Sequence, residues 1–94
     1  MESLKEILAS DKTVIIDVRS PMEFMGGHVA NSRNIPLQEI PEYVEELKTL
    51  NTPIVLCCAS GNRSGQALNF LKQKGLTNIY NGGGWLQVNN VKNN

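Results

Sequence analysis

The sequence predicts an α/β domain in which a parallel sheet carries helices on both faces. Segments 13–18 and 53–57 are short apolar runs rich in β-branched residues, a composition typical of strands buried on both sides. Amphipathic helical patterns separate such runs, and strands that alternate with helices form parallel sheets. A length of 94 residues fits one domain, 1–94, with a modest core.

In the first half of the chain, apolar residues at helical spacing over 4–8 predict a short helix before the strand 13–18. Ser20 followed by Pro21 is a typical helix start, because serine caps the first turn and proline suits its first position. One helical turn is therefore expected up to Met25. Two further segments are expected, a loop over 28–34 and a brief extended piece over 35–37.

The second half begins with a longer helical pattern. Apolar residues over 40–50 recur at every third or fourth position, which predicts a helix that covers one face of the sheet. After the strand 53–57, a second apolar face predicts a helix from Ser64 that ends at Gly75. A last short strand is expected over 77–80. The remaining segments are expected to be a loop over 81–84, a helical turn over 85–88 and a frayed end over 89–94.

Composition and charge exclude several classes of function. Nine Lys and Arg balance nine Asp and Glu, so no nucleic-acid or membrane partner is expected. No segment has the ~20 apolar residues of a membrane span, and the N-terminus lacks the pattern of a signal peptide, so the protein is expected to be soluble and cytoplasmic. The two cysteines are adjacent and there is one histidine, so neither a disulfide framework nor a four-ligand zinc site is expected.

The residues that predict chemistry lie between the strand ending at Cys57 and the helix that follows. Ligands of open α/β sheets bind at the carboxyl ends of strands. Cys58 at this position faces the backbone N–H groups of its own loop and the positive end of the next helix, and both stabilise a thiolate. Arg63 adds a fixed charge and planar donors that suit oxyanions. We predict Cys58 as the nucleophile and, as substrate-binding residues, Ala59, Ser60, Gly61, Asn62, Arg63 and Ser64.

Each of these residues has a structural alternative. Free cysteine is among the most buried residue types, so Cys58 could be an ordinary buried cysteine, and this interpretation suits Cys57 well. Arg63 could be an ordinary surface residue of the loop, and Ser64 could be a plain helix cap. A strand end, a polar loop, an arginine and a helix start coincide at Cys58, and this coincidence favours a functional role for it.

Four blocks of sequence, in order, resemble the single-domain rhodaneses, a family of sulfurtransferases. The blocks are Asp17–Phe24 with Gly27–Val29, then Asn34–Leu37, then Cys58–Ser64, and finally Gly83–Trp85. The resemblance extends over roughly residues 3–88. It implies a five-stranded, mostly parallel sheet with helices on both faces, and it implies that Cys58 carries a persulfide.

The activity that the resemblance implies is a two-step sulfur transfer. Cys58 takes the outer sulfur of a small-molecule donor such as thiosulfate, and then yields it to cyanide or a thiol, with a protein as a possible acceptor. Both steps are displacements at sulfur, so no cofactor and no metal is expected. Three alternatives remain. They are a non-catalytic rhodanese-like interaction or regulatory module, a cysteine phosphatase, and a thiol redox protein.

Two of these alternatives conflict with the spacing of the loop. A phosphatase of the related fold needs five residues between its cysteine and arginine, whereas four separate Cys58 from Arg63. A redox protein needs a Cys-x-x-Cys spacing, which this sequence lacks. Outside the loop, residues of the first block and its surroundings are expected to form a loop-fixing network: Asp17, Arg19, Glu23 and His28. Asn31 stands where the family commonly has glycine, and asparagine tolerates the positive φ of such a turn.

Overall fold

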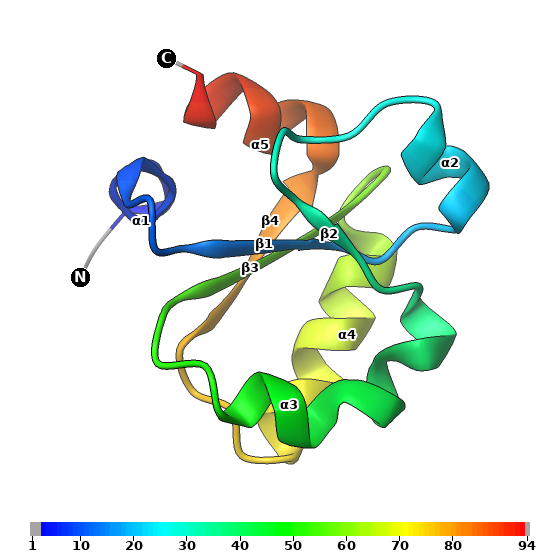
Figure 1. The fold of residues 1–94 in the computed structure, drawn as a ribbon, viewed down its shortest axis with the longest axis vertical. Coiled ribbons are helices and arrows are strands. Elements are labelled where there is room, and N and C mark those ends of the chain that lie inside the picture. The colour runs from blue at the N-terminus through cyan, green and yellow to red at the C-terminus, as the bar shows by residue number, and fades with distance from the viewer. Residues whose placement is uncertain (1–2, 94) are drawn as a thin grey trace.

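The structure, a computed structural model, describes residues 3–93 and contains one parallel sheet (Figure 1). Its strand order is β2-β1-β3-β4, and every neighbouring pair is parallel. The predicted parallel α/β fold is confirmed, but the described residues form four strands where five were expected. In the described residues, α1 and a turn precede β1, and α5 begins directly after β4, which leaves no extended segment there for a fifth strand. The strands are β1 (Val14–Asp17), β2 (Arg33–Asn34), β3 (Ile54–Cys58) and β4 (Ile79–Gly84).

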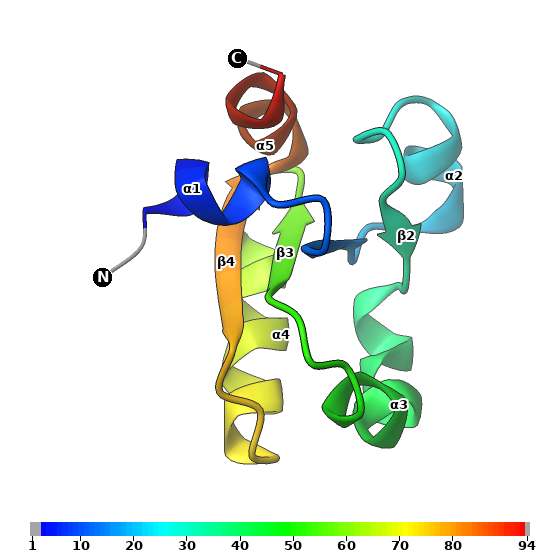
Figure 2. The ribbon, with the colours of Figure 1, turned by 60° about the vertical axis from the view of Figure 1, so that its left-hand side comes forward.

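Helices cover both faces of the sheet, as Figure 2 shows from the side. One face packs against the 3₁₀ helix η1, against α3 and against α4, through residues that include Ile40, Leu47 and Leu71. The other packs against α1 and α5, through residues that include Ile7 and Val88. The helices are α1 (Leu4–Ala9), α2 (Pro21–Met25), η1 (Leu37–Tyr43), α3 (Val44–Lys48), α4 (Asn62–Gln73) and α5 (Trp85–Lys92).

Side chains of β3 alternate between these two cores, because successive residues of a strand point to opposite faces. Ile54, Leu56 and Cys58 lie in the core beneath α4. Val55 and Cys57 lie in the core beneath α1 and α5. The two adjacent thiols are therefore separated by the sheet itself.

Several element boundaries differ from the sequence-based expectations. The helix expected over 40–50 is divided into η1 and α3, since Pro41 has no N–H and its ring opposes regular α-helical bonding. The strand expected near 35–37 is β2, two residues earlier, where it pairs with the end of β1. Helix α4 begins at Asn62 rather than at Ser64.

The C-terminal part of the chain is more regular than predicted. The glycine-rich segment 81–84 is not a loop but the last four residues of β4, with an extra residue, Gly82, between the partners of Leu56 and Cys57. A Cβ on Gly82 would lie 2.6 Å from Val88 and 2.8 Å from Val55, so only glycine fits between strand and helix. Residues 89–94 are expected to be frayed, but helix α5 continues to Lys92, and residue 94 lies outside the described residues.

Candidate active site

The candidate site is the loop 59–61, which joins the carboxyl end of β3 to the amino end of α4 in the upper right of Figure 1. Gly61 turns the chain with a φ of 99°, a conformation that favours glycine. A Cβ on Gly61 would also lie 3.3 Å from the Cα of Gly83 in β4. The backbone conformation therefore favours glycine here, and the space available is tight for any side chain.

The sulfur of Cys58 faces into this loop. The Gly61 N–H donates to Sγ at 2.9 Å, and the Ser64 hydroxyl lies 3.4 Å from it. The residue is only 1% exposed, and this burial opposes ionisation. Hydrogen bonds from the Ser64 hydroxyl and from the N–H groups of Ser64, Ser60 and Gly61 outweigh the burial, and they lower the pKa of Cys58 to about 7. A large fraction of this thiol is therefore ionised near neutral pH.

Cys57 has the opposite environment. Burial among apolar side chains raises its pKa to about 12, and the nearby Asp17 charge acts in the same direction. Its thiol stays protonated at neutral pH and is inert as a nucleophile. Cys57 is the buried strand residue that the sequence predicts.

Asn81 in β4 holds the loop in place, and the sequence-based site did not include it. Its side-chain N–H donates to the Gly61 carbonyl at 3.1 Å. Its side-chain oxygen accepts from the Ser64 hydroxyl at 2.7 Å and from the Gly83 N–H at 2.9 Å. A polar side chain before three glycines is a signal for this role, but the glycines themselves predict a loop.

Arg63 does not point to the loop as an unpaired cation. Its guanidinium donates to both carboxylate oxygens of Glu23 in α2, at 2.8 and 3.0 Å. The same carboxylate accepts the Ser20 N–H at 3.1 Å. Hydrogen bonds from Arg63 and then from Ser20 lower the pKa of Glu23 to about 2. The structure thus brings Glu23 to the site and pairs it with the predicted anion-binding arginine.

A second ion pair lies in the interior. Arg19 donates to both carboxylate oxygens of the fully buried Asp17, with a shortest distance of 2.7 Å, and to the Gly27 carbonyl at 2.6 Å. Its guanidinium also lies 4.9 Å from the ring centre of Trp85, at the start of α5. Through its contacts with Gly27 and Trp85, Arg19 links the segment after α2 to α5, which agrees with the loop-fixing role predicted for these residues.

Two further sequence-based predictions concern His28 and Asn31, in the segment that follows α2. His28 is exposed, stacks on Phe24 at 3.7 Å and bonds the Phe24 carbonyl through Nδ1 at 2.7 Å, so it stabilises α2 rather than either ion pair. Asn31 has a φ of 67°, which confirms the predicted positive φ.

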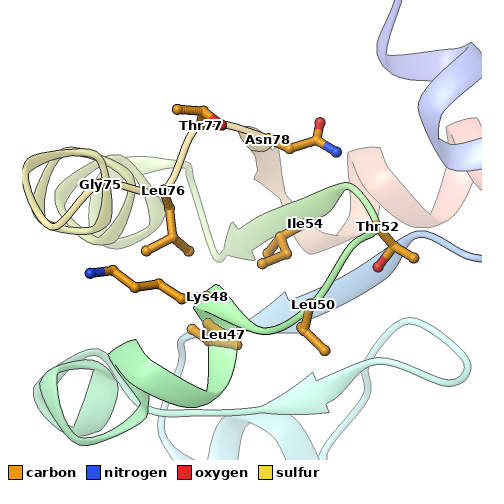
Figure 3. Close-up of a pocket in the computed structure, with 9 residues that line it drawn as sticks. All are labelled: Leu47, Lys48, Leu50, Thr52, Ile54, Gly75, Leu76, Thr77 and Asn78. Atoms are coloured by element: carbon orange, nitrogen blue, oxygen red, sulfur yellow. The ribbon is translucent and has the colours of Figure 1, made fainter.

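A cavity of about 130 Å³ at the other end of β3 carries no comparable chemistry (Figure 3). It opens between Leu47, Ile54 and Leu76, and Lys48 is the one ionisable side chain among the residues that line it. In the part of the chain that the structure describes, no three His, Cys, Asp or Glu side chains are grouped as a metal site would need. None of the helices over 3–93 has the length and apolar character that would cross a membrane.

Comparisons with known proteins agree on one family. The sequence profile of the rhodanese-like domain matches residues 1–90. The chain is 44% identical over 70 residues to the uncharacterized protein YqhL of Bacillus subtilis. The aligned region covers 74% of this chain and 55% of YqhL. It is 37% identical over 70 residues to the thiosulfate sulfurtransferase PspE of Escherichia coli. The aligned region covers 73% of this chain and 67% of PspE. This chain thus spans about half the length of YqhL.

The solved structure of a rhodanese with anions from Escherichia coli is also similar. Its TM-score is 0.73 at 34% identity, and the match covers 80% of this chain and 89% of that one.

Proposed function

Since the chain belongs to the rhodanese-like domain family, we propose that it is a sulfurtransferase that moves sulfane sulfur through a persulfide on Cys58. The observation that carries this proposal is the environment of one sulfur atom. The Ser64 hydroxyl and backbone N–H groups of its own loop surround Sγ of Cys58 and bring its pKa to about 7. A module that only binds a partner has no need of such an activated thiol.

In the first step, the Cys58 thiolate attacks the outer sulfur of a donor. With thiosulfate, a new S–S bond forms to Cys58 while the S–S bond of the donor breaks, and its electron pair leaves with sulfite. The product is the Cys58 persulfide anion, whose outer sulfur extends about 2 Å beyond Sγ. The N–H groups that stabilise the thiolate also favour this anion, so the loop serves both states.

In the second step, an acceptor attacks the outer sulfur of the persulfide. Cyanide becomes thiocyanate, or a thiol becomes a persulfide, and the electron pair of the broken S–S bond returns to Cys58 as thiolate. We propose that residues 59–64 bind the reacting groups, mainly through the backbone, because the side chains of Ala59, Ser60 and Asn62 carry no charge. Both steps are substitutions at sulfur and use only this chain's own groups.

The test measures the intact mass of the protein after incubation with thiosulfate, and then thiocyanate after cyanide is added. We expect one added sulfur atom in the Cys57→Ser variant and none in Cys58→Ser, because only Cys58 ionises near neutral pH. The two variants are matched controls, since each removes one buried thiol from β3. Transfer that survives in a folded Cys58→Ser protein would disprove the assignment of the nucleophile.

A further inference from the structure

The charges beside the loop set a limit on the donors that it can accept. Arg63 supplies the fixed positive charge that an anionic donor would use, and Glu23 occupies both arms of its guanidinium. The two side chains are 36% and 39% exposed, so the carboxylate is as accessible to a donor as the guanidinium is. Any anion that approaches Arg63 therefore also approaches Glu23.

The second ion pair beside the site adds no positive excess. Asp17 and Arg19 form the second ion pair, which is closed within the interior. Among these four charged side chains the sum is zero, and the ionised thiol of Cys58 adds one negative charge. Glu23 itself stays ionised at any pH at which the thiolate forms, since its pKa is about 2. These four side chains and the Cys58 thiolate thus carry a net formal charge of −1 in the reactive state.

Coulomb repulsion scales with the charge of the donor, so this site penalises a doubly charged donor twice as much as a singly charged one. We propose that Glu23 is a specificity-determining residue. It disfavours the doubly charged thiosulfate and favours singly charged sulfane-sulfur donors, specifically organic persulfides. This inference rests on the proposed function and narrows its donor.

The chemistry with a persulfide donor balances without another reactant. The Cys58 thiolate attacks the outer sulfur of the donor, a new S–S bond forms, and the donor's own S–S bond breaks. Its electron pair leaves on the donor's thiolate, so two thiol-derived anions enter and two leave. No oxidant or reductant is consumed, because sulfane sulfur keeps its oxidation state.

The test compares two donors that differ in charge and share the reacting group. Thiosulfate carries two negative charges, whereas the methanethiosulfonate ion, CH₃SO₂S⁻, carries one and releases methanesulfinate in place of sulfite. The rate of persulfide formation on Cys58 is measured for each by intact mass under single-turnover conditions. The variant is Glu23→Gln, since its amide oxygen can still accept the Ser20 N–H and one Arg63 donor.

The matched control is Glu46→Gln. Glu46 pairs with Arg33, so this change also removes one carboxylate from an exposed ion pair and alters the net charge equally. Helix α3, which carries Glu46, lies at the far end of the molecule from the loop (Figure 1). Any effect of net charge alone appears in both variants.

With Glu23→Gln we expect about tenfold faster reaction of thiosulfate and about threefold faster reaction of methanethiosulfonate, while Glu46→Gln changes neither appreciably. Salt gives a second measurement on the unmodified protein. Like charges repel less at high ionic strength, so added salt should accelerate the thiosulfate reaction.

Two results would overturn the inference while the proposed function stands. One is thiosulfate reacting with unmodified protein more slowly as salt rises, which means that the site is net positive. The other is an equal response of both donors to Glu23→Gln. Absence of any persulfide on Cys58 with either donor, in all variants, would instead overturn the proposed function together with this inference.

Discussion

Replacement of Ser64 by alanine tests how the loop activates its sulfur. The Ser64 hydroxyl has one proton and two neighbouring acceptors, Asn81 at 2.7 Å and Cys58 at 3.4 Å. When Cys58 ionises, this hydroxyl can turn to the thiolate, and it is the largest of the contributions that lower the pKa of Cys58. Ser64→Ala should therefore raise that pKa.

The magnitude follows from the geometry. A hydrogen bond to a charged group is worth about 1.5–3 kcal/mol. The Ser64 hydroxyl lies 3.4 Å from the sulfur and can donate to Asn81 instead, so we expect its contribution to be at or just below the lower end of this range. About 1.4 kcal/mol corresponds to a tenfold lower thiolate fraction at a pH below both pKa values. Alkylation of Cys58 at pH 6 should therefore slow about tenfold in Ser64→Ala, whereas at pH 10 the thiol is ionised in both proteins and they should react at similar rates.

The assay is the rate of alkylation of Cys58 by iodoacetamide, followed by mass across this pH range. The Cys57→Ser background leaves a single thiol to count. The rate should rise with pH through about 7 in the parent protein, because thiolate forms above the pKa and is lost below it. Identical midpoints in the parent and in Ser64→Ala would refute the role given to the hydroxyl, and a parent midpoint near the ordinary value for cysteine would refute activation by the loop.

Two further predictions concern the surroundings of the loop. Arg63→Ala should slow sulfur uptake from thiosulfate at least tenfold, because it leaves the Glu23 carboxylate uncompensated, while the urea midpoint changes little, since an exposed ion pair contributes about 0–1 kcal/mol. A large fall in the urea midpoint with unchanged uptake would mean that Arg63 is a structural clamp. Gly82→Ala should destabilise the fold by about 1–3 kcal/mol in urea unfolding, because its methyl group would overlap Val88 and Val55. A variant as stable as the parent would contradict the packing described for β4.

The sequence predicts the parts of this molecule that depend on local pattern. Apolar runs locate β1 and β3, and the position of Cys58 at a strand end before a polar loop indicates the nucleophile. These features lie within a few residues of one another, so periodicity and turn chemistry are enough to find them. The end of α4 near Gly75, which has a φ of 103°, is likewise predictable from local sequence, because glycine readily adopts this conformation after a helix.

The features that escape prediction depend on contacts between distant segments. Arg63 and Glu23 are 40 residues apart, and nothing local indicates that the guanidinium is already paired. Asn81 reaches a loop 20 residues earlier in the chain. Three glycines predict a loop by local propensity, but packing against α5 and β3 makes them a strand, which shows tertiary structure overriding propensity.

The close contact between β4 and the loop 59–61 means that the backbone of β4 limits the size of the loop. The backbone of Gly83 lies against Gly61, and a Cβ on Gly84 would lie 2.8 Å from the Ala59 carbonyl oxygen. A longer loop, such as phosphate chemistry needs, could not expand toward β4, because no side chain there can be trimmed to make room. An attempt to convert this scaffold to another reaction by loop insertion must therefore rebuild β4 at the same time, or displace α2 and the carboxylate that it carries.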